Sequence, residues 1–437
     1  MPIGARNSRC LTGRLLRGIC PYYRSRPTNN AVNENSPVSS RSSRAPRRGP
    51  RRPPSAPKPG PASEPIEGVL ELTSQGHGFL RRDPNWLPSR EDLFVPNNLV
   101  RQYGLRTGQS IKAEWRPPAK GQRSASVSQV LAIEGDDPAE AKNWPLFEQL
   151  VAESPTKRIR LERSSEDYSA RAIDLFAPMG FGQRGLIIAQ PFAGKTTLLR
   201  NIASSMAERY PESERFILLV DERPEEVTEF RRLNVGHVIG SSFDNGAENH
   251  LKNAELLMAR AHRLVEQGKN VVMLVDSLTR LARASNLSGK QSGRTMSGGL
   301  DPAALQFPRR LFGAARATDR GGSFTIIATV LVDTGSRMDD MVFEEFKGTG
   351  NWELRLDRKL AEARLFPAMD IAATGTRREE LLYTPEELTA VQRLRRFLSG
   401  QAGDRQEQLD MLLKWFKRFP TNQQIIEVAS QIQAQSK

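Results

Sequence analysis

Residues 185–199 decide the fold, and they read Gly-Leu-Ile-Ile-Ala-Gln-Pro-Phe-Ala-Gly-Lys-Thr-Thr-Leu-Leu. A short apolar run ends at Ala189, a turn carries Gly194, Lys195 and Thr196, and a helical pattern of apolar residues follows. In this context backbone N–H groups wrap phosphate oxygens, the Lys side chain neutralises their charge, and the Thr hydroxyl ligates Mg²⁺. Ala189 stands where the motif usually begins with Gly, which loosens the pattern. The stretch predicts a P-loop that binds ATP and Mg²⁺.

Further apolar runs continue the same architecture toward the C-terminus. They cover residues 215–220, 270–275 and 323–332 and alternate with helical patterns. Continuous apolar strands separated by helices are typical of a parallel sheet that is covered on both faces. Near the end of the chain, Thr384 precedes a proline and two glutamates, which is typical of a helix start. Residues 171–437 are therefore expected to form an α/β P-loop NTPase domain with C-terminal helices.

Five short strand-like runs precede this domain and are separated by turn residues. Short strands at such close spacing suggest a small β-barrel, which we expect over residues 65–135. A connector rich in proline and charged residues is expected over residues 136–170. The five runs are residues 68–72, 78–82, 93–95, 110–115 and 126–133.

The N-terminal residues carry most of the protein's positive charge. Residues 1–63 hold thirteen Arg and Lys but a single Glu, which is +12 of the net charge of +14. Few of residues 24–63 are apolar, so burial cannot offset their ordering entropy, and residues 1–64 are expected to be disordered. The Arg-rich start also fits an organelle transit peptide, although a basic arm that attracts RNA is the plainer interpretation.

Two features of the sequence point to a soluble protein of the cytoplasm. The two cysteines, Cys10 and Cys20, lie in the basic tail without metal-binding spacing, so nothing indicates a disulfide framework. No apolar run approaches the roughly twenty residues that a membrane helix needs.

Two carboxylates are candidates for the chemistry of ATP hydrolysis, which needs one acid beside Mg²⁺ and another to orient the attacking water. Asp276 follows the apolar run 270–275, at the sheet edge where the P-loop is expected. Glu222 comes two residues after the run 215–220. Either acid taken alone also fits a solvated side chain or a helix cap. It is the P-loop that favours the catalytic interpretation.

Several strings outside the P-loop are too specific to arise together by chance. They are residues 182–185 (Gly-Gln-Arg-Gly), 221–228 (Asp-Glu-Arg-Pro-Glu-Glu-Val-Thr), 276–283 (Asp-Ser-Leu-Thr-Arg-Leu-Ala-Arg), 312–316 (Phe-Gly-Ala-Ala-Arg), 344–351 (Glu-Glu-Phe-Lys-Gly-Thr-Gly-Asn) and 375–377 (Gly-Thr-Arg). With them, residues 66–437 closely resemble the Rho family of bacterial transcription termination factors, which are RNA-dependent ATPases built as rings of six RecA-like domains. The resemblance implies an OB or cold-shock-like RNA-binding barrel ahead of a RecA-like ATPase domain.

The resemblance implies a role for each residue of the nucleotide site. Glu222 would activate water, and Asp276 would accompany Mg²⁺. Arg377 is similar to an arginine finger that reaches the ATP of the neighbouring subunit, and Arg364 resembles a second arginine from that neighbour. Hydrolysis would then need the homohexameric ring. The implied ATP-binding residues are Gly180, Phe181, Gly182, Gln183, Arg184, Gly185, Phe192, Ala193, Gly194, Lys195, Thr196, Thr197 and Arg223.

The resemblance also implies two RNA-binding regions. The barrel would capture single-stranded, pyrimidine-rich RNA by stacking bases on aromatic rings, although Phe94 fits the barrel core equally well. Two pore loops, residues 289–301 and 334–337, would follow the RNA backbone, whereas without the resemblance they would be interpreted as solvent loops. The implied barrel residues are Gly76, His77, Gly78, Phe79, Leu80, Arg81, Asp92, Leu93, Phe94, Gln122, Arg123 and Ser124. The implied pore residues are Arg294, Thr295, Met296, Ser297, Gly298, Gly299, Leu300, Asp301 and Arg337.

Four departures from the family pattern change what we expect. The family commonly has a small helical bundle ahead of the barrel, where this chain has the basic tail. His77 and Ser124 stand where Phe and Tyr are usual, which weakens the expected preference for cytosine. Phe192 stands where the family often has a second Lys near the γ-phosphate, so we expect weaker ATP binding or slower turnover. In the pore loops, Arg294 and Arg337 replace typical lysines and keep the charge but not the donor geometry.

The resemblance therefore predicts a homohexameric ATPase that binds nascent RNA, moves along it from 5′ to 3′ and dislodges the RNA polymerase elongation complex. Two rival functions stay open. One is a ring ATPase of the rotary-synthase type, which shares the core, and the other is an RNA-binding regulator that uses ATP only for assembly.

Overall fold

The structure, a computed structural model, describes residues 64–118, 124–242, 246–288 and 296–432. The basic tail expected over residues 1–64 thus lies outside the described residues, except for Glu64. Among the residues described, no helix is both long and apolar enough to cross a membrane.

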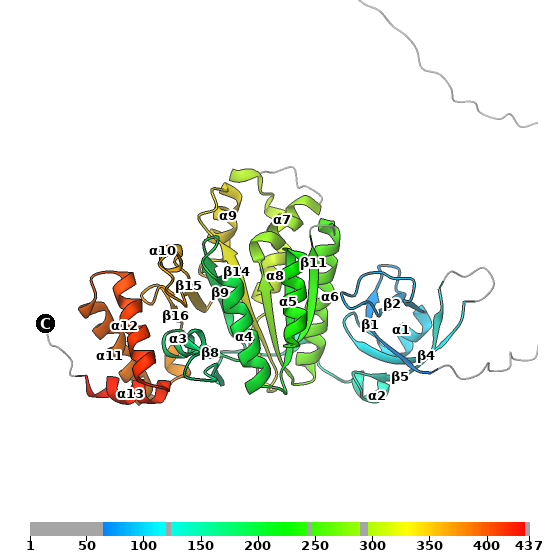
Figure 1. Cartoon of the computed structure of the whole chain (residues 1–437). Coiled ribbons are helices and arrows are strands. Elements are labelled where there is room, and N and C mark those ends of the chain that lie inside the picture. Colours follow the sequence, from blue (N-terminus) through cyan, green and yellow to red (C-terminus); the bar gives the residue numbers. More distant parts are fainter. Residues whose placement is uncertain (1–63, 119–123, 243–245, 289–295, 433–437) are drawn as a thin grey trace, which may run out of the picture. The chain divides into compact units, whose positions relative to one another are not determined.

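The first folded part is a closed barrel with the strand order β1-β2-β3-β5-β4 (Figure 1). Each of the five predicted strands is present, with ends within two residues of the expected ones. Gly78 permits the close approach of β1, because a Cβ at this position would lie 2.7 Å from Leu70 Cδ1. The barrel elements are β1 (Ile66–Leu72), β2 (Gly78–Arg81), β3 (Leu93–Val95), α1 (Asn97–Tyr103), β4 (Ser110–Arg116) and β5 (Ser126–Ile133).

The second part is built on a sheet whose central strands are parallel, in the order β11-β10-β12-β14-β9-β15-β16. The four predicted apolar runs form β9, β10, β12 and β14, so the expected α/β class is confirmed. Strands β11 and β15 were not predicted. The bounds are β9 (Arg184–Ala189), β10 (Glu214–Glu222), β11 (His237–Ser242), β12 (Asn270–Asp276), β14 (Ser323–Leu331), β15 (Trp352–Arg355) and β16 (Gly375–Thr376).

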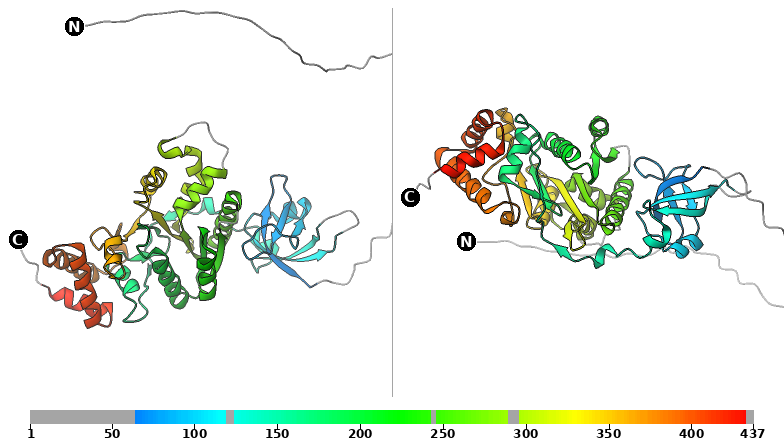
Figure 2. Two further views of the ribbon diagram at one scale, coloured as in Figure 1. Left: turned by 45° about the horizontal axis from the view of Figure 1, so that its top comes forward. Right: turned by 90° about the horizontal axis from the view of Figure 1, so that it is seen from below.

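Helices cover both faces of this sheet (Figure 2), and alternating strand residues supply both cores. In β9, Ile187 packs with the core of α4 and α5, whereas Leu186 and Ile188 pack with the core of α6, α7 and α8. This alternation follows from the period of two along a strand. The helices are α4 (Lys195–Arg209), α5 (Pro224–Leu233), α6 (Ala247–Glu266), α7 (Leu278–Ser288), α8 (Gln306–Gly313), α9 (Arg337–Phe346) and α10 (Arg358–Glu362).

Three helices end the chain, and the first begins where the sequence predicts. Thr384 caps it by accepting a hydrogen bond from the Glu387 N–H, and the Glu387 side chain accepts from the Thr384 N–H in return. The buried Arg171 ties these helices to α3, because its guanidinium donates to the carbonyl oxygens of Phe416 and Phe419. The helices are α3 (Tyr168–Phe176), α11 (Pro385–Gln401), α12 (Arg405–Arg418) and α13 (Asn422–Gln431).

The segment between the barrel and α3 takes part in the main sheet. Strand β6 pairs with β13, which in turn pairs with β14.

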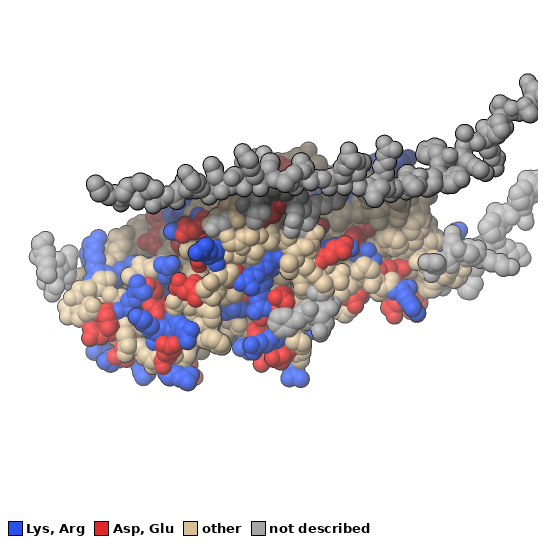
Figure 3. Space-filling model, turned by 90° about the horizontal axis from the view of Figure 1, so that it is seen from above, with Lys and Arg blue, Asp and Glu red and all other residues tan. Residues whose placement is uncertain are grey.

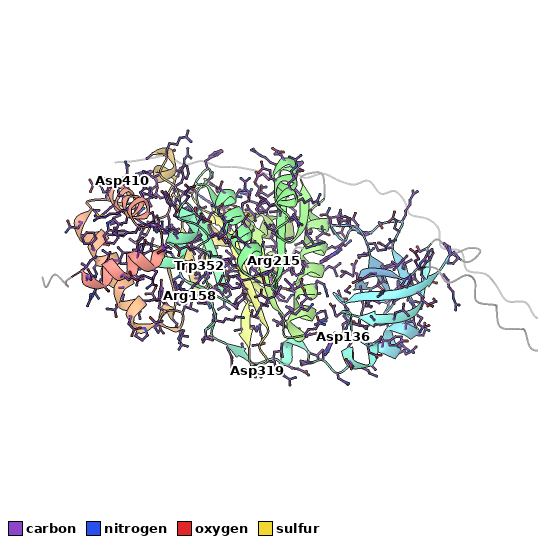
Figure 4. All side chains as sticks on the ribbon, turned by 60° about the horizontal axis from the view of Figure 1, so that its bottom comes forward. Asp136, Arg158, Arg215, Asp319, Trp352 and Asp410 are labelled. Carbon is purple, nitrogen blue, oxygen red and sulfur yellow. The ribbon has the colours of Figure 1, made fainter. Side chains whose placement is uncertain are left out.

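Trp352, labelled in Figure 4, is fully buried and donates from Nε1 to the carbonyl oxygen of Ala177 at 2.7 Å. The short elements are α2 (Pro138–Ala141), β6 (Ala152–Glu153), β7 (Arg158–Ile159), β8 (Met179–Gly180), β13 (Arg316–Thr318) and the 3₁₀ turns η1 (Phe147–Gln149), η2 (Ser297–Gly299), η3 (Pro302–Leu305) and η4 (Glu379–Leu381).

Candidate functional site

The predicted P-loop joins β9 to α4. Gly194 caps the helix with φ of +93°, a left-handed conformation that favours glycine. The first residue of α4 is Lys195, so the free N–H groups of the helix start face the loop. Phe192 has φ of +66°, and 87% of its surface is exposed. The loop thus has the geometry of an anion site, with an exposed aromatic ring at its tip.

Two buried carboxylates lie beside this loop at the carboxyl ends of neighbouring strands. Asp276 ends β12 and Glu222 ends β10, and their exposed fractions are 1% and 2%. The Lys195 ammonium donates to both Asp276 oxygens at 2.7 Å and to Glu222 Oε1 at 3.2 Å. The structure therefore brings together the three residues that the sequence predicts for catalysis.

Burial and charge tune the protonation of this cluster. Burial by itself lowers the pKa of Lys195, but Asp276 and Glu222 outweigh it, so the net pKa is raised. Burial, followed by the charge of Asp276, raises the pKa of Glu222 above its ordinary value, against the opposing effect of Lys195. Lys195 thus stays cationic, and Glu222 is a better proton acceptor than a solvated glutamate.

Two neighbours that the sequence did not reveal hold the acids in place. The Thr329 hydroxyl, from near the carboxyl end of β14, donates to Asp276 Oδ1 at 2.7 Å. A guanidinium nitrogen of Arg280 lies 3.5 Å from Glu222 Oε1. Thr329 is fully buried, and Arg280 follows Asp276 on α7.

The donors beside Lys195 suit Mg²⁺ only together with a nucleotide. The Thr196 hydroxyl and the Asp276 carboxylate are hard oxygen donors of the kind that Mg²⁺ prefers. No cluster of three or more acidic, His or Cys side chains able to hold a metal is found in the described part of the chain. Most of the coordination would therefore come from phosphate and water oxygens, as is usual for Mg²⁺ in nucleotide sites.

A pocket of about 270 Å³ opens beside the P-loop and was not predicted. Its wall includes Gly194 and Thr197 from the loop and the half-exposed ring of Phe366. A flat apolar ring next to a phosphate-binding loop is suited to stack on a nucleobase. Phe366 carries no local sequence signal, because it follows a short loop far along the chain from residues 194–197.

Residues 180–185 do not lie with the P-loop of their own chain. They precede or begin β9, whereas the P-loop follows its end, and the five residue steps of the strand span about 16 Å. Arg377 lies at the same edge as Arg184, because β16 pairs with the start of β15. Burial lowers the pKa of Arg184, and the nearby charges of Arg316 and Arg377 lower it further. The chain thus gathers three guanidinium groups at the edge remote from its own phosphate loop.

The other two predicted arginines are exposed. Arg223 caps α5 directly after Glu222. Arg364 has φ of +60° and lies two residues before Phe366. Among the described residues, neither guanidinium has a hydrogen bond or an ion pair.

Three rings form a cluster on the barrel, outside its core. The ring centroids of His77 and Phe79 are 5.7 Å apart, those of His77 and Phe94 are 5.2 Å apart, and those of Phe79 and Phe94 are 5.9 Å apart. The rings come from β2, β3 and the turn before β2, where Gly76 has φ of +84°. Neither Phe79 nor Phe94 belongs to the barrel core. The cluster therefore offers stacking faces of the kind that single-stranded RNA binds.

The other residues predicted to bind RNA on the barrel differ in burial and in charge pairing. Leu80 and Leu93 are buried in the core, because they alternate with the outward-facing Phe79 and Phe94. The Arg81 guanidinium is 2.5 Å from both Glu71 Oε2 and Asp92 Oδ2, so its charge and that of Asp92 are already paired. Of the remaining predictions, Ser124 is partly exposed, and Gln122 and Arg123 lie outside the described residues.

The residues predicted to line the pore also differ in how far their side chains are buried. Leu300 is fully buried, and Asp301 is mostly buried and caps η3, so neither side chain is open to solvent in this conformation. Gly299 is exposed, and Arg337 begins α9 with an exposed side chain. Met296 is partly exposed, and a Cβ on Gly298 would lie 2.7 Å from the Met338 nitrogen. Arg294, Thr295 and the side chain of Ser297 lie outside the described residues.

Positive and negative charges are mixed on one face of the described residues. In the face shown by Figure 3, basic and acidic side chains lie side by side wherever grey atoms do not cover them. This distribution fits the small net charge that remains once the basic tail is excluded. An RNA site on this part of the chain must therefore depend on local geometry more than on a broad basic field.

Two protein-family models match the chain. The RNA-binding domain of the Rho termination factor matches residues 66–139. The nucleotide-binding domain of the ATP synthase alpha/beta family matches residues 169–375. The first match covers the barrel, and the second covers the P-loop and both buried acids.

Similar proteins and structures extend these matches. Transcription termination factor Rho of Bacillus subtilis is 49% identical over 367 residues, which is 84% of this chain and 85% of the relative. The factor Rho of Escherichia coli K12 is 50% identical over 336 residues, or 76% and 80% of the two chains. Among solved structures, an ATPase of a type III secretion system is 25% identical with a TM-score of 0.53, over 64% of this chain and 86% of that one.

Proposed function

Because the chain belongs to the Rho family of transcription termination factors, we propose that it is an RNA-dependent ATPase that moves along nascent RNA and dislodges RNA polymerase. The observation that carries this proposal is the buried cluster of Lys195, Asp276 and Glu222 in a chain that also bears an aromatic RNA-binding barrel. The cluster supplies hydrolysis, and the barrel supplies a site for RNA. The proposed place of action is the cytoplasm.

In the proposed reaction, Glu222 accepts a proton from the attacking water, and its raised pKa suits that role. Lys195 turns from the acids to the phosphates when ATP enters, since a phosphate chain offers more negative charge than the acids alone. Bound Mg²⁺ would neutralise phosphate charge, with Thr196 and Asp276 as its protein-side partners. Phe366 holds the base, which fixes the nucleotide relative to Glu222.

The site is complete only in an oligomer. Arg377 lies at the sheet edge remote from its own P-loop, and the roughly 16 Å length of β9 exceeds the reach of an arginine side chain. A neighbouring subunit would bring Arg377, with Arg184 and Arg316 beside it, to the γ-phosphate of the first. This arrangement favours a ring and explains why residues 180–185 lie with Arg377. The proposed ring is a homohexamer, in which Arg364 acts as the second arginine.

The test is ATP hydrolysis with and without single-stranded RNA. Wild type should hydrolyse ATP only with RNA, and Glu222→Ala should lose about 100-fold or more. Glu225→Ala is the matched control, because Glu225 is the exposed acid of the same segment. Hydrolysis that ignores RNA would favour an ATPase of the rotary type, and no hydrolysis at all would favour a regulator that only binds ATP.

Mixing two inactive variants tests the shared site. Arg377→Ala keeps its own P-loop, and Lys195→Ala keeps its own finger. Rings that contain both variants hold some sites with an intact P-loop and an intact neighbouring Arg377, so activity should reappear on mixing. Failure to regain activity in mixed rings would contradict the assignment of Arg377.

A further inference from the structure

Gln190, the second residue of the P-loop, makes two hydrogen bonds that do not involve the phosphate site. Its Nε2 donates to Asp333 Oδ2 at 2.6 Å, and its Oε1 accepts from the Arg358 N–H at 3.1 Å. Asp333 follows the end of β14 by two residues, and Arg358 begins α10. One amide thus joins the nucleotide loop to two segments remote in sequence.

Asp333 stands directly before the pore segment, residues 334–337. It has φ of +54°, a left-handed conformation that costs a non-glycine residue on the order of 1 kcal/mol. The next residue, Thr334, donates from its hydroxyl to Asp339 Oδ2 at 2.6 Å. The base of the pore segment is therefore held on one side by Gln190 and on the other by Asp339.

Asp339 leads back to the second half of the nucleotide site. Its carboxylate accepts from Arg283 at 2.9 and 2.6 Å, and Arg283 lies on α7, which follows Asp276. The pore segment is thus attached both to the helix after the Mg²⁺-side acid and to the phosphate loop. The second attachment consists of the Gln190 side chain and a backbone bond from Val332 to Ala189 at 3.1 Å, which continues the pairing of β14 with β9.

The Gln190 contact lies in the wall of a cavity of about 810 Å³, whose lining includes Asp333 and Arg358. Both partners are exposed, so no close-packed core surrounds the bond. Because of this, the bond can shift or open without the cost of unpacking apolar side chains. A contact of this kind is suited to transmit a small loop movement.

We propose that Gln190 is a positioning residue that couples the nucleotide state of the P-loop to the RNA-contacting segment 334–337. The inference rests on the proposed function, since it needs ATP at one end and RNA at the other. When phosphate groups shift the P-loop, Gln190 moves Asp333 with it. This movement changes the orientation of the Arg337 side chain toward RNA.

The experiment measures RNA affinity with and without a non-hydrolysable ATP analogue, and the coupling is the ratio of the two dissociation constants. Gln190→Glu places a carboxylate against Asp333, while its remaining oxygen still accepts from the Arg358 N–H. Asp333→Asn keeps an acceptor for Gln190. The double variant Q190E/D333N restores a bond with reversed polarity, in which the Asn amide donates to the Glu carboxylate. Gln190→Leu removes the amide without adding charge.

Wild type should show a coupling ratio within about 5 to 150. The ratio should fall close to one in Q190E and Q190L, stay within about twofold of wild type in D333N, and recover in the double variant. A wild-type ratio in both Gln190 variants, or no recovery in the double variant, would overturn the role of Gln190. A ratio of one in wild type itself would contradict the proposed RNA-dependent function, and so separates the two failures.

Discussion

The hydroxyl of Thr329 donates a hydrogen bond of 2.7 Å to Oδ1 of Asp276, across the neighbouring strands β14 and β12. Asp276 also accepts from Lys195, so its orientation is set from two sides. Because both oxygens of a Mg²⁺-side acid must be oriented before the metal arrives, Thr329 prepares the site for the nucleotide.

Replacement of Thr329 by valine should therefore impair hydrolysis while the fold stays intact. The two side chains have nearly the same shape, but valine cannot donate to Asp276. The loss of this hydrogen bond removes about 1.5 kcal/mol or more of the stabilisation of the Asp276 carboxylate. We expect kcat to fall about tenfold and the Mg²⁺ concentration for half-maximal activity to rise. Thr329→Ser keeps the hydroxyl and should stay close to wild type. Equal activities for the valine and serine variants would show that the hydroxyl is dispensable.

The raised pKa of Glu222 predicts where activity is lost in acid. A general base must be ionised, so kcat/KM falls as the pH drops through the folded-state pKa of Glu222. Burial and Asp276 raise that pKa. The fall of kcat/KM in acid should therefore be centred above pH 4.3, the approximate pKa of a free glutamate. Lys195, whose pKa is raised, stays protonated over the same range. The measurement is kcat/KM between pH 4 and 9. A fall centred at or below pH 4.3 would contradict the assignment of Glu222 as the general base.

Comparison of sequence and structure shows which parts of the site carry local signals. Lys195, Asp276 and Glu222 were predictable, because each follows a strand and the carboxyl ends of parallel strands meet at one edge. Thr329 and Phe366 were not, since their roles depend on pairings between segments far apart in the chain. The prediction that Leu80 and Leu93 contact RNA treated all residues of β2 and β3 as if they lay on one face. The period of two already separates them from Phe79 and Phe94.

Phe366 should govern the binding of ATP and not the chemical step. Its ring lines the pocket next to Thr197, away from the carboxylates that act on the γ-phosphate. Loss of a stacked base costs about 1 to 3 kcal/mol, so Phe366→Ala should raise KM for ATP by roughly tenfold and leave kcat nearly unchanged. Phe366→Tyr preserves the ring and serves as the control. A fall in kcat at unchanged KM would place the residue elsewhere in the mechanism.

Phe79 should contribute to RNA affinity by stacking. Its ring lies in the cluster with His77 and Phe94, and its removal should cost about 1 to 3 kcal/mol of binding. Because the ring is uncharged, the salt dependence of binding should not change in Phe79→Ala. Titration of single-stranded RNA at several salt concentrations measures both quantities, with Phe79→Tyr as the control. A flatter salt slope in the alanine variant would indicate a disturbed ionic contact with the RNA in place of lost stacking.

His262 should make the folded state sensitive to acid. Its ring stacks on Phe147 with centroids 3.8 Å apart, and its Nε2 is buried without a hydrogen-bond partner among the described residues. Burial, aided by the charge of Arg263, lowers its pKa to about 3. The unfolded chain therefore binds more protons than the folded one between pH 6.5 and 3, so stability falls as the pH drops through this window.

At pH 5 the titration of His262 lowers the free energy of unfolding by about 2 kcal/mol relative to neutral pH. His262→Phe keeps an aromatic ring in the stack and removes the titration, so its gain in thermal midpoint over wild type should be larger at pH 5 than at pH 7. The difference between the two proteins isolates this residue, because burial also lowers the pKa values of His237 and His250 in both. Parallel shifts of the two midpoints with pH would mean that His262 does not titrate in this window.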